Sequence, residues 1–230
     1  MSNYKNYQPK NVNEIIFGSE KSKTMIEEII SNNFPFPFSG KSGIILYGAF
    51  GTGKTTLARL LPNAIERGNS GNDLYMQEEY FGCEQGHTGN SITSLVKRQL
   101  NFMSLNASGN HYFIFDEVDN LSKAAQAGLK TILNNQCAIF ILTTNNVSLL
   151  DKGVKDRCLL VEMNAVTDAE FLPLCERIAC DANVVLNDTQ LLDAIAGNGG
   201  SFRNVISNVI QLANNTLRQQ ITTTIARASI

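Results

Sequence analysis

The stretch from residue 43 to residue 56, GIILYGAFGTGKTT, constrains the fold of this chain more than any other. An apolar run typical of a buried strand leads into a glycine-rich turn, and a lysine and two threonines follow. Glycine has no Cβ, so the backbone at Gly48, Gly51 and Gly53 can adopt positive φ and point successive N–H groups at a ligand. A helix beginning at Lys54 adds its positive amino end. The stretch therefore predicts a strand, an anion-binding loop and a helix.

The spacing from Gly48 to Thr55 matches G-x-x-x-x-G-K-[ST], the P-loop pattern of nucleotide-binding proteins. In that pattern Lys54 reaches the β- and γ-phosphates of ATP, and the Thr55 hydroxyl binds Mg²⁺, which prefers oxygen ligands. The alternative is an ordinary glycine turn that precedes a lysine. The candidate nucleotide-binding residues of the loop are Gly48, Gly51, Thr52, Gly53, Lys54, Thr55 and Thr56.

Composition bounds what surrounds this loop. The chain has 230 residues, of which 43% are apolar and 17% charged, a balance typical of a folded protein with a sizeable core. The formal net charge of −2 gives no global attraction to nucleic acid, so DNA contact would need a local basic patch. No apolar run approaches a membrane span and no signal-peptide pattern opens the chain, which predicts a cytoplasmic protein without a membrane partner.

The five cysteines are odd in number and include no C-x-x-C pair. Neither a zinc site nor a disulfide framework is indicated. We expect all five to be small, buried apolar residues.

Short apolar runs alternate with helical stretches between residues 43 and 163, as the βαβ units of a parallel sheet require. The fold class is therefore α/β, a P-loop core with a five-stranded parallel sheet. Pro62 should end or kink the helix after the loop, and residues 68–73 should form a loop. The five runs are GIILY, DLYMQEEYFGC, HYFIFD, AIFILTT and CLLVEM.

The ends of the chain differ from this core. Residues 1–42 read as an N-terminal adaptor with a helix near residues 20–32 and a docked, extended FPFPF segment. Beyond residue 163 only helical periodicity remains, in three segments with N-cap residues. We therefore predict two domains, a nucleotide-binding core with its adaptor over 1–163 and a small all-α lid over 164–230.

A second motif, HYFIFDEVDN, places two carboxylates after the third strand. Asp116 would lie at the carboxyl end of a buried strand, where open α/β sheets bind ligands, and would help to hold Mg²⁺. Glu117 can orient and deprotonate an attacking water. The alternative is a solvated strand end. Asn145, after the fourth strand, could contact the γ-phosphate or that water, although such an asparagine can also be a simple turn residue.

Four segments together resemble one family. GAFGTGKTT, FDEVDNLSKAAQAGLK, ILTTNNVSLLDKGVKDRC and GNGGSFRNVISNVIQLA are similar to the Walker A, Walker B, sensor 1 with S-R-C, and sensor 2 segments of AAA+ ATPases. The strongest similarity is to clamp-loader subunits of the replication factor C and bacterial gamma type. It extends from NYQPKNVNEIIFGSE, which resembles their nucleotide-cradling Y-R-P segment, through the lid.

The resemblance assigns roles to five residues. It makes Asn145 the sensor 1 residue that couples the γ-phosphate to the catalytic water. It makes Arg203 the sensor 2 arginine of the lid, and a surface charge at the start of a helix is the alternative for that residue. It makes Arg157 an arginine finger that serves the nucleotide of a neighbouring subunit. Tyr7 and Pro9 would cradle the nucleotide, although Gln8 replaces the arginine of that segment.

Three basic residues are candidates for DNA contact or for its coupling to hydrolysis. In clamp loaders a basic residue at the Lys130 position links DNA to the Walker B glutamate, whereas an ordinary surface lysine is the alternative. Lys97 and Arg98 lie on a helix expected over 91–103, and a solvated helical face is their alternative.

Asp156 replaces the serine of S-R-C and could pair with Arg157.

The implied function is an ATP- and Mg²⁺-dependent AAA+ ATPase that acts on DNA or DNA-bound proteins in replication or recombination, with itself or related AAA+ subunits as partners. Two alternatives are a protein remodeller or regulator of mobile elements, and a nucleotide-dependent binding subunit with little hydrolysis. No residues follow Ile230 that could form the helical collar of clamp loaders. We therefore expect either a truncated product or a free-standing ATPase.

Overall fold

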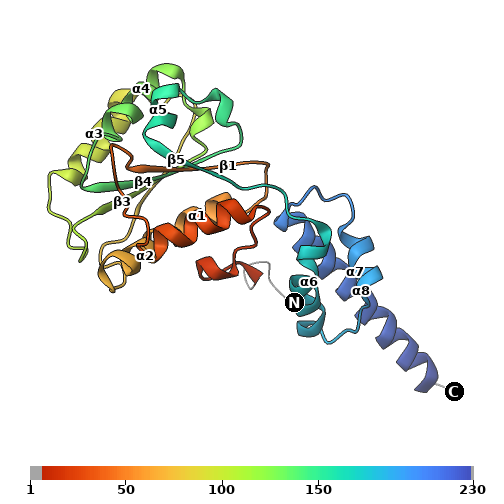
Figure 1. Ribbon diagram of the computed structural model, residues 1–230. Coiled ribbons are helices and arrows are strands. Elements are labelled where there is room, and N and C mark those ends of the chain that lie inside the picture. Colours follow the sequence, from red (N-terminus) through yellow and green to blue (C-terminus); the bar gives the residue numbers. More distant parts are fainter. Residues whose placement is uncertain (1–6, 229–230) are drawn as a thin grey trace. The chain divides into compact units, whose positions relative to one another are not determined.

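The computed structural model describes residues 7–228, which form two compact units (Figure 1). One unit comprises Lys10–Ala49 and Gly53–Met163 and contains the sheet. The other comprises residues 7–9, Phe50–Thr52 and 164–228 and contains the C-terminal helices. Among residues 7–228 no helix is both long and apolar enough to cross a bilayer.

The sheet is parallel throughout, with its five strands in the order β2-β3-β4-β1-β5. The strands predicted around the motifs are confirmed, because β1 (Gly43–Tyr47), β3 (His111–Asp116) and β4 (Ala138–Thr144) coincide with the apolar runs. β4 pairs with both β1 and β3, so the three motif-bearing strands are neighbours. The edge strands are β2 (Glu79–Gly82) and β5 (Cys158–Glu162).

Alternate strand residues face opposite helical layers, since side chains along a strand have a period of two. Ile45 and Phe113 join the core beneath α3 (Gly89–Leu100), α4 (Lys123–Ile132) and α5 (Lys152–Asp156). Ile44 and Ile114 join the core beneath α1 (Glu20–Ile30) and α2 (Lys54–Ser70). Figure 1 shows these two layers on opposite faces of the sheet. The adaptor packs on the second layer, where Phe36 is buried.

The second unit consists of α6 (Leu172–Asp181), α7 (Asp188–Ile195) and α8 (Phe202–Ala228). Capping boxes at Thr167 and Asn187 start the first two helical segments, as the sequence predicts. Short 3₁₀ turns in the two units complete the elements, at Val12–Glu14, Val118–Asn120, Val147–Leu149 and Asp168–Phe171.

Three sequence expectations about the fold were wrong. The second apolar run predicted a strand over residues 73–83, whereas β2 has only four residues, as a short edge strand with one pairing partner. α2 continues to Ser70, so residues 68–70 are helical and not part of the predicted 68–73 loop; Pro62 therefore does not end the helix, which is one of the two effects expected of it. The proline is buried, and the packing of α2 on the sheet offsets the backbone hydrogen bond that it removes.

The third wrong expectation concerns the cysteines. All five are free thiols, but Cys137 and Cys180 are exposed, while the other three are buried. Burial raises the pKa of Cys83 and of Cys158 to about 12, so these two thiols stay protonated and inert.

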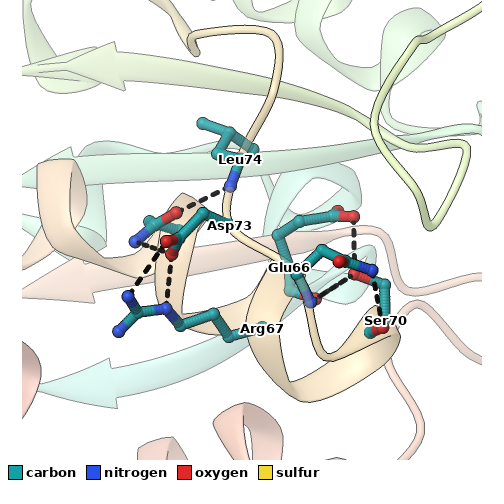
Figure 2. Close-up of polar contacts among 7 residues, drawn as sticks. Glu66, Arg67, Ser70, Asp73 and Leu74 are labelled. Atoms are coloured by element: carbon teal, nitrogen blue, oxygen red, sulfur yellow. Dashed lines mark hydrogen bonds and ion pairs between the residues drawn. The ribbon is translucent and has the colours of Figure 1, made fainter.

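A buried carboxylate ties α2 to β3. Glu66 Oε1 accepts hydrogen bonds from the Ser70 hydroxyl and the Ser108 N–H, at 3.0 and 2.8 Å. Its Oε2 accepts from the Ser108 hydroxyl and from Tyr112 Oη on β3, at 2.5 and 2.9 Å. Burial alone would raise the pKa of Glu66, but these hydrogen bonds together hold it below its usual value. Figure 2 shows this carboxylate beside the end of α2, where Arg67 also pairs with Asp73. The helix that carries Lys54 and Thr55 is thereby fixed against the strand that carries Asp116.

We expect Glu66→Gln to lower the free energy of unfolding by roughly 2–3 kcal/mol at pH 7, because a neutral amide leaves buried donors poorly satisfied. Because the folded pKa is depressed, this stabilisation is present above the unfolded pKa of about 4.3 and is lost as pH falls through the folded value. Urea unfolding of both proteins at pH 7 and below pH 4 measures the difference. The exposed Glu28→Gln is the control, and an equal loss at both pH values would contradict the ionised network.

Candidate nucleotide-binding site

The glycine loop begins where β1 ends and closes on the amino end of α2. Gly48 and Gly53 have φ values of 150° and 88°, which favour glycine. A Cβ on Gly48 would lie 2.2 Å from the carbonyl oxygen of Met163, so no side chain fits there. Gly53 is the N-cap of α2, and the N–H groups of the first turn therefore follow directly. This is the strand, loop and helix that the sequence predicts.

Lys54 is buried at the start of α2, where its Nζ donates to the carbonyl oxygens of Gly48 and Ala49 at 3.0 and 2.6 Å. Burial lowers the pKa of its ammonium, and the carboxylates of Asp119, Asp116 and Glu117 oppose that shift. The lysine is thus a poorly hydrated cation held inside the loop. Such a cation interacts strongly with phosphate oxygens that enter the loop.

Asp116 lies at the carboxyl end of β3 and is the centre of a cluster of hydroxyl groups. Thr55 Oγ1 lies 2.9 and 3.2 Å from its two carboxylate oxygens. Thr143 donates to Oδ1, and Tyr80 donates to Oδ2 at 2.6 Å. The carboxylate is buried, so these three donors hold it in one orientation. Both residues predicted to bind Mg²⁺, Thr55 and Asp116, are therefore side by side.

These oxygen ligands fit Mg²⁺. One carboxylate and one threonine hydroxyl are hard donors, and Mg²⁺ sites in such proteins are completed by nucleotide phosphates and water. Within residues 7–228 no group of three or more His, Cys, Asp and Glu side chains could hold a metal ion. The metal would neutralise charge on the phosphates.

Glu117 is exposed beside this cluster. Its φ is 58°, a left-handed conformation unusual for glutamate, and its N–H donates to Thr143 Oγ1 at 2.9 Å. The carboxylate accepts only one weak hydrogen bond from the described residues, from Asn120 Nδ2 at 3.3 Å. Glu117 is thus a solvated carboxylate that directly follows the buried Asp116 in the chain. Asn145 follows β4 at the same edge of the sheet and is half-buried.

Sequence reasoning missed two residues of this site. The sequence places Thr143 in the apolar run AIFILTT and Tyr80 in DLYMQEEYFGC, and neither run predicts a role for the residue in the site. Tyr80 pairs with Ile114 across β2 and β3, so Asp116, two residues further, lies on the same face. Arg59 of α2 lies over the tyrosine ring at 4.0 Å. Burial raises the pKa of Tyr80, and its hydrogen bond to Asp116 raises it further, so the phenol remains a donor.

Arg157 lies beside the amino ends of the parallel strands, whereas the glycine loop and Asp116 lie at their carboxyl ends. Its carbonyl oxygen accepts from the N–H groups of Ser42 and Gly43, at the amino end of β1. The glycine loop follows the carboxyl end of the same strand, roughly 16 Å away at 3.3 Å per residue. The expected pairing of Arg157 with Asp156 was wrong, because no such ion pair occurs among the described residues. The guanidinium instead donates to Asn134 Oδ1 and to the Gly153 carbonyl oxygen, each at 2.8 Å.

The remaining candidates are divided between the two units. Lys130 forms an ion pair with Asp151 at 3.4 Å, and no bond joins it to Glu117 in the described part of the chain. Lys97 and Arg98 are exposed on α3. In the second unit, Arg203 is exposed in the first turn of α8, and Tyr7 is buried with Arg177 over its ring at 5.6 Å. Pro9, half-buried, belongs to the same unit, as do Gly51 and Thr52, whereas Thr56 lies in α2.

Comparison with known proteins identifies a matching family and similar sequences. The family described as ATPase family associated with various cellular activities (AAA) matches residues 44–163, just over half of the chain. Replication factor C small subunit 2 of Pyrobaculum islandicum is 24% identical over 229 residues, which are 98% of this chain and 67% of that protein. Replication factor C large subunit of Methanosarcina mazei is 23% identical over 90% of this chain and 33% of its own length.

A solved structure shares the fold. The RuvB Holliday junction branch migration motor of Thermotoga maritima has a TM-score of 0.64 and 18% identity, over 95% of this chain and 67% of that one. At this identity the likeness supports the architecture alone.

Proposed function

The chain belongs to the AAA family of ATPases, and we propose that it binds and hydrolyses ATP with Mg²⁺ in order to act on DNA or on DNA-bound proteins. The observation that carries the proposal is the cluster at the carboxyl edge of the sheet, where Lys54, Thr55 and Asp116 converge and Glu117 lies beside them. These are the groups that phosphate binding, metal binding and water activation require.

In this proposal each residue has one task. The glycine loop and Lys54 bind the phosphates, and Thr55 with Asp116 holds the metal. Glu117 orients and deprotonates the attacking water, while Asn145 bridges that water and the γ-phosphate. The domain division remains part of the proposal, with a core over 1–163 and a lid over 164–230 that contributes Arg203. Tyr7 and Pro9 would contact the nucleotide.

A neighbouring subunit is a necessary part of the proposal. Arg157 lies at the amino edge of the sheet, too far from its own glycine loop to reach its own nucleotide. We therefore assign it to the nucleotide of a second AAA subunit, either another copy or a relative. Such assembly agrees with a head-to-tail interface, in which one edge of each subunit meets the opposite edge of the next. A cytoplasmic location belongs to the same proposal.

The DNA-directed part of the proposal rests on the similarity to replication factor C subunits. We expect primed or single-stranded DNA to raise ATP turnover at low salt, and the stimulation to fall steeply with salt because phosphate contacts release counterions. Lys97→Glu with Arg98→Glu should reduce it. Phosphate release with and without DNA, at several salt concentrations, measures the effect.

The control for that experiment is Lys123→Glu with Glu14→Gln, two exposed changes outside α3. Turnover that no DNA stimulates at low salt would contradict the DNA-directed role. It would favour a protein remodeller that uses the same ATPase site.

A further inference from the structure

The side chain of Arg157 is held by its own chain from two directions. Its Nε donates to Asn134 Oδ1 at 2.8 Å, just beyond the end of α4. Its Nη1 donates to the carbonyl oxygen of Gly153 in α5, also at 2.8 Å. Among the described residues, Asn134 is the only side chain that hydrogen-bonds to this guanidinium. The guanidinium is therefore held by Asn134, just beyond α4, and by Gly153 in α5.

The backbone around Arg157 is anchored as well. Lys41 Nζ donates to the carbonyl oxygens of Asp156 and Cys158, at 2.6 and 3.1 Å, on either side of the arginine. The Arg157 carbonyl oxygen itself accepts from two N–H groups at the start of β1. The backbone position is thus fixed, and only the side-chain torsions remain to be restrained.

The backbone of Gly153, whose carbonyl oxygen accepts the hydrogen bond from Arg157 Nη1, is also held in place. Asp151 Oδ1 accepts from the Gly153 N–H at 2.7 Å and pairs with Lys130 at 3.4 Å. A Cβ on Gly153 would lie 2.7 Å from Lys130 Cδ and 3.5 Å from Arg157 Nη1. The absence of a side chain at this position therefore lets the lysine and the arginine approach the same turn.

A guanidinium has five N–H donors, and only two of them are used here. Within residues 7–228 the structure gives Nη2 no hydrogen-bond partner, so its donors remain for another molecule. We propose that Asn134 is a positioning residue for the reaction: by accepting from Nε, it presents the Nη2 end of Arg157 to the γ-phosphate of the nucleotide bound by the neighbouring subunit. This inference rests on the arginine-finger role proposed above. A restrained side chain loses less rotamer freedom when it meets that phosphate.

The test is Asn134→Ala in the full chain, assayed at a protein concentration that saturates assembly. We expect kcat to fall about tenfold, the size of one hydrogen bond to a charged group. The KM for ATP should not change, because Asn134 contacts neither the chain's own glycine loop nor Asp116. Asn134→Asp keeps an acceptor for Nε and should retain most of the turnover. Gln136→Ala, an exposed amide two residues away, is the matched control.

A double variant distinguishes this role from a general structural one. Asn134→Ala should cause no further loss in the Arg157→Ala background, because it acts only through the arginine. An additional loss there, or a wild-type or higher kcat for Asn134→Ala alone, would overturn the positioning role while leaving the finger intact. Wild-type turnover of Arg157→Ala would overturn the finger and this inference with it. Thermal melting establishes that each variant is folded.

Discussion

Lys54→Ala is expected to abolish tight ATP binding, whereas Glu117→Gln is expected to bind ATP normally and to lose turnover. Lys54 is a buried cation that would contact the phosphates of bound ATP, so its removal should weaken affinity by about 10²-fold or more. Glu117 is exposed, and its carboxylate would act only when water attacks, so its loss should lower kcat by about 10²- to 10⁴-fold. Isothermal titration and phosphate release separate the two effects.

Matched controls exist for both variants. Lys123→Ala and Glu84→Gln change exposed residues of the same types, and each should bind and hydrolyse ATP as the wild type does. Equal loss of binding in Lys54→Ala and Glu117→Gln would contradict the role assigned to Glu117. Full turnover of Glu117→Gln would mean that another group activates the water.

The strands around the motifs could be predicted because each is a continuous buried apolar run. β1, β3 and β4 are the central strands of the sheet, and their residues are buried almost throughout. The second run contains acidic and aromatic residues in no clear alternation, and only Glu79–Gly82 pairs. α2 also continues past Pro62, because packing of this helix on the sheet outweighs the intrinsic preference of proline.

In the candidate site, too, some residues could be predicted from local sequence pattern and others depend on tertiary structure. Lys54, Thr55, Asp116 and Glu117 lie in contiguous motifs whose spacing alone suggests their chemistry. Tyr80 and Asn134 have no such motif, because they reach Asp116 and Arg157 only through tertiary structure. The period-two alternation of β3 places Asp116 on the same face as Ile114. Placing Tyr80 beside them also requires the register between β2 and β3, which the sequence does not provide.

Turnover per subunit is expected to rise with protein concentration, because Arg157 cannot serve its own site. The arginine lies at the amino end of β1, and the glycine loop at the carboxyl end. An arginine finger supplied by a neighbour is worth about 10³- to 10⁵-fold in rate, since it neutralises charge on the transferred phosphoryl group. A monomer should therefore bind ATP and hydrolyse it slowly. Arg157→Ala should show that slow rate at every concentration.

Mixing two inactive variants gives the most direct test of transfer between subunits. Arg157→Ala retains its own Glu117, and Glu117→Gln retains its finger, so a contact between them rebuilds one complete site. In an equal mixture of head-to-tail assemblies, about a quarter of the sites should be complete, and about a quarter of wild-type turnover should return. Mixing Arg157→Ala with the double variant Arg157→Ala and Glu117→Gln is the control, because no subunit then supplies a finger. Turnover that stays at the level of the separate variants, or wild-type turnover of Arg157→Ala alone, would show that Arg157 is a structural residue held by Asn134 and Gly153.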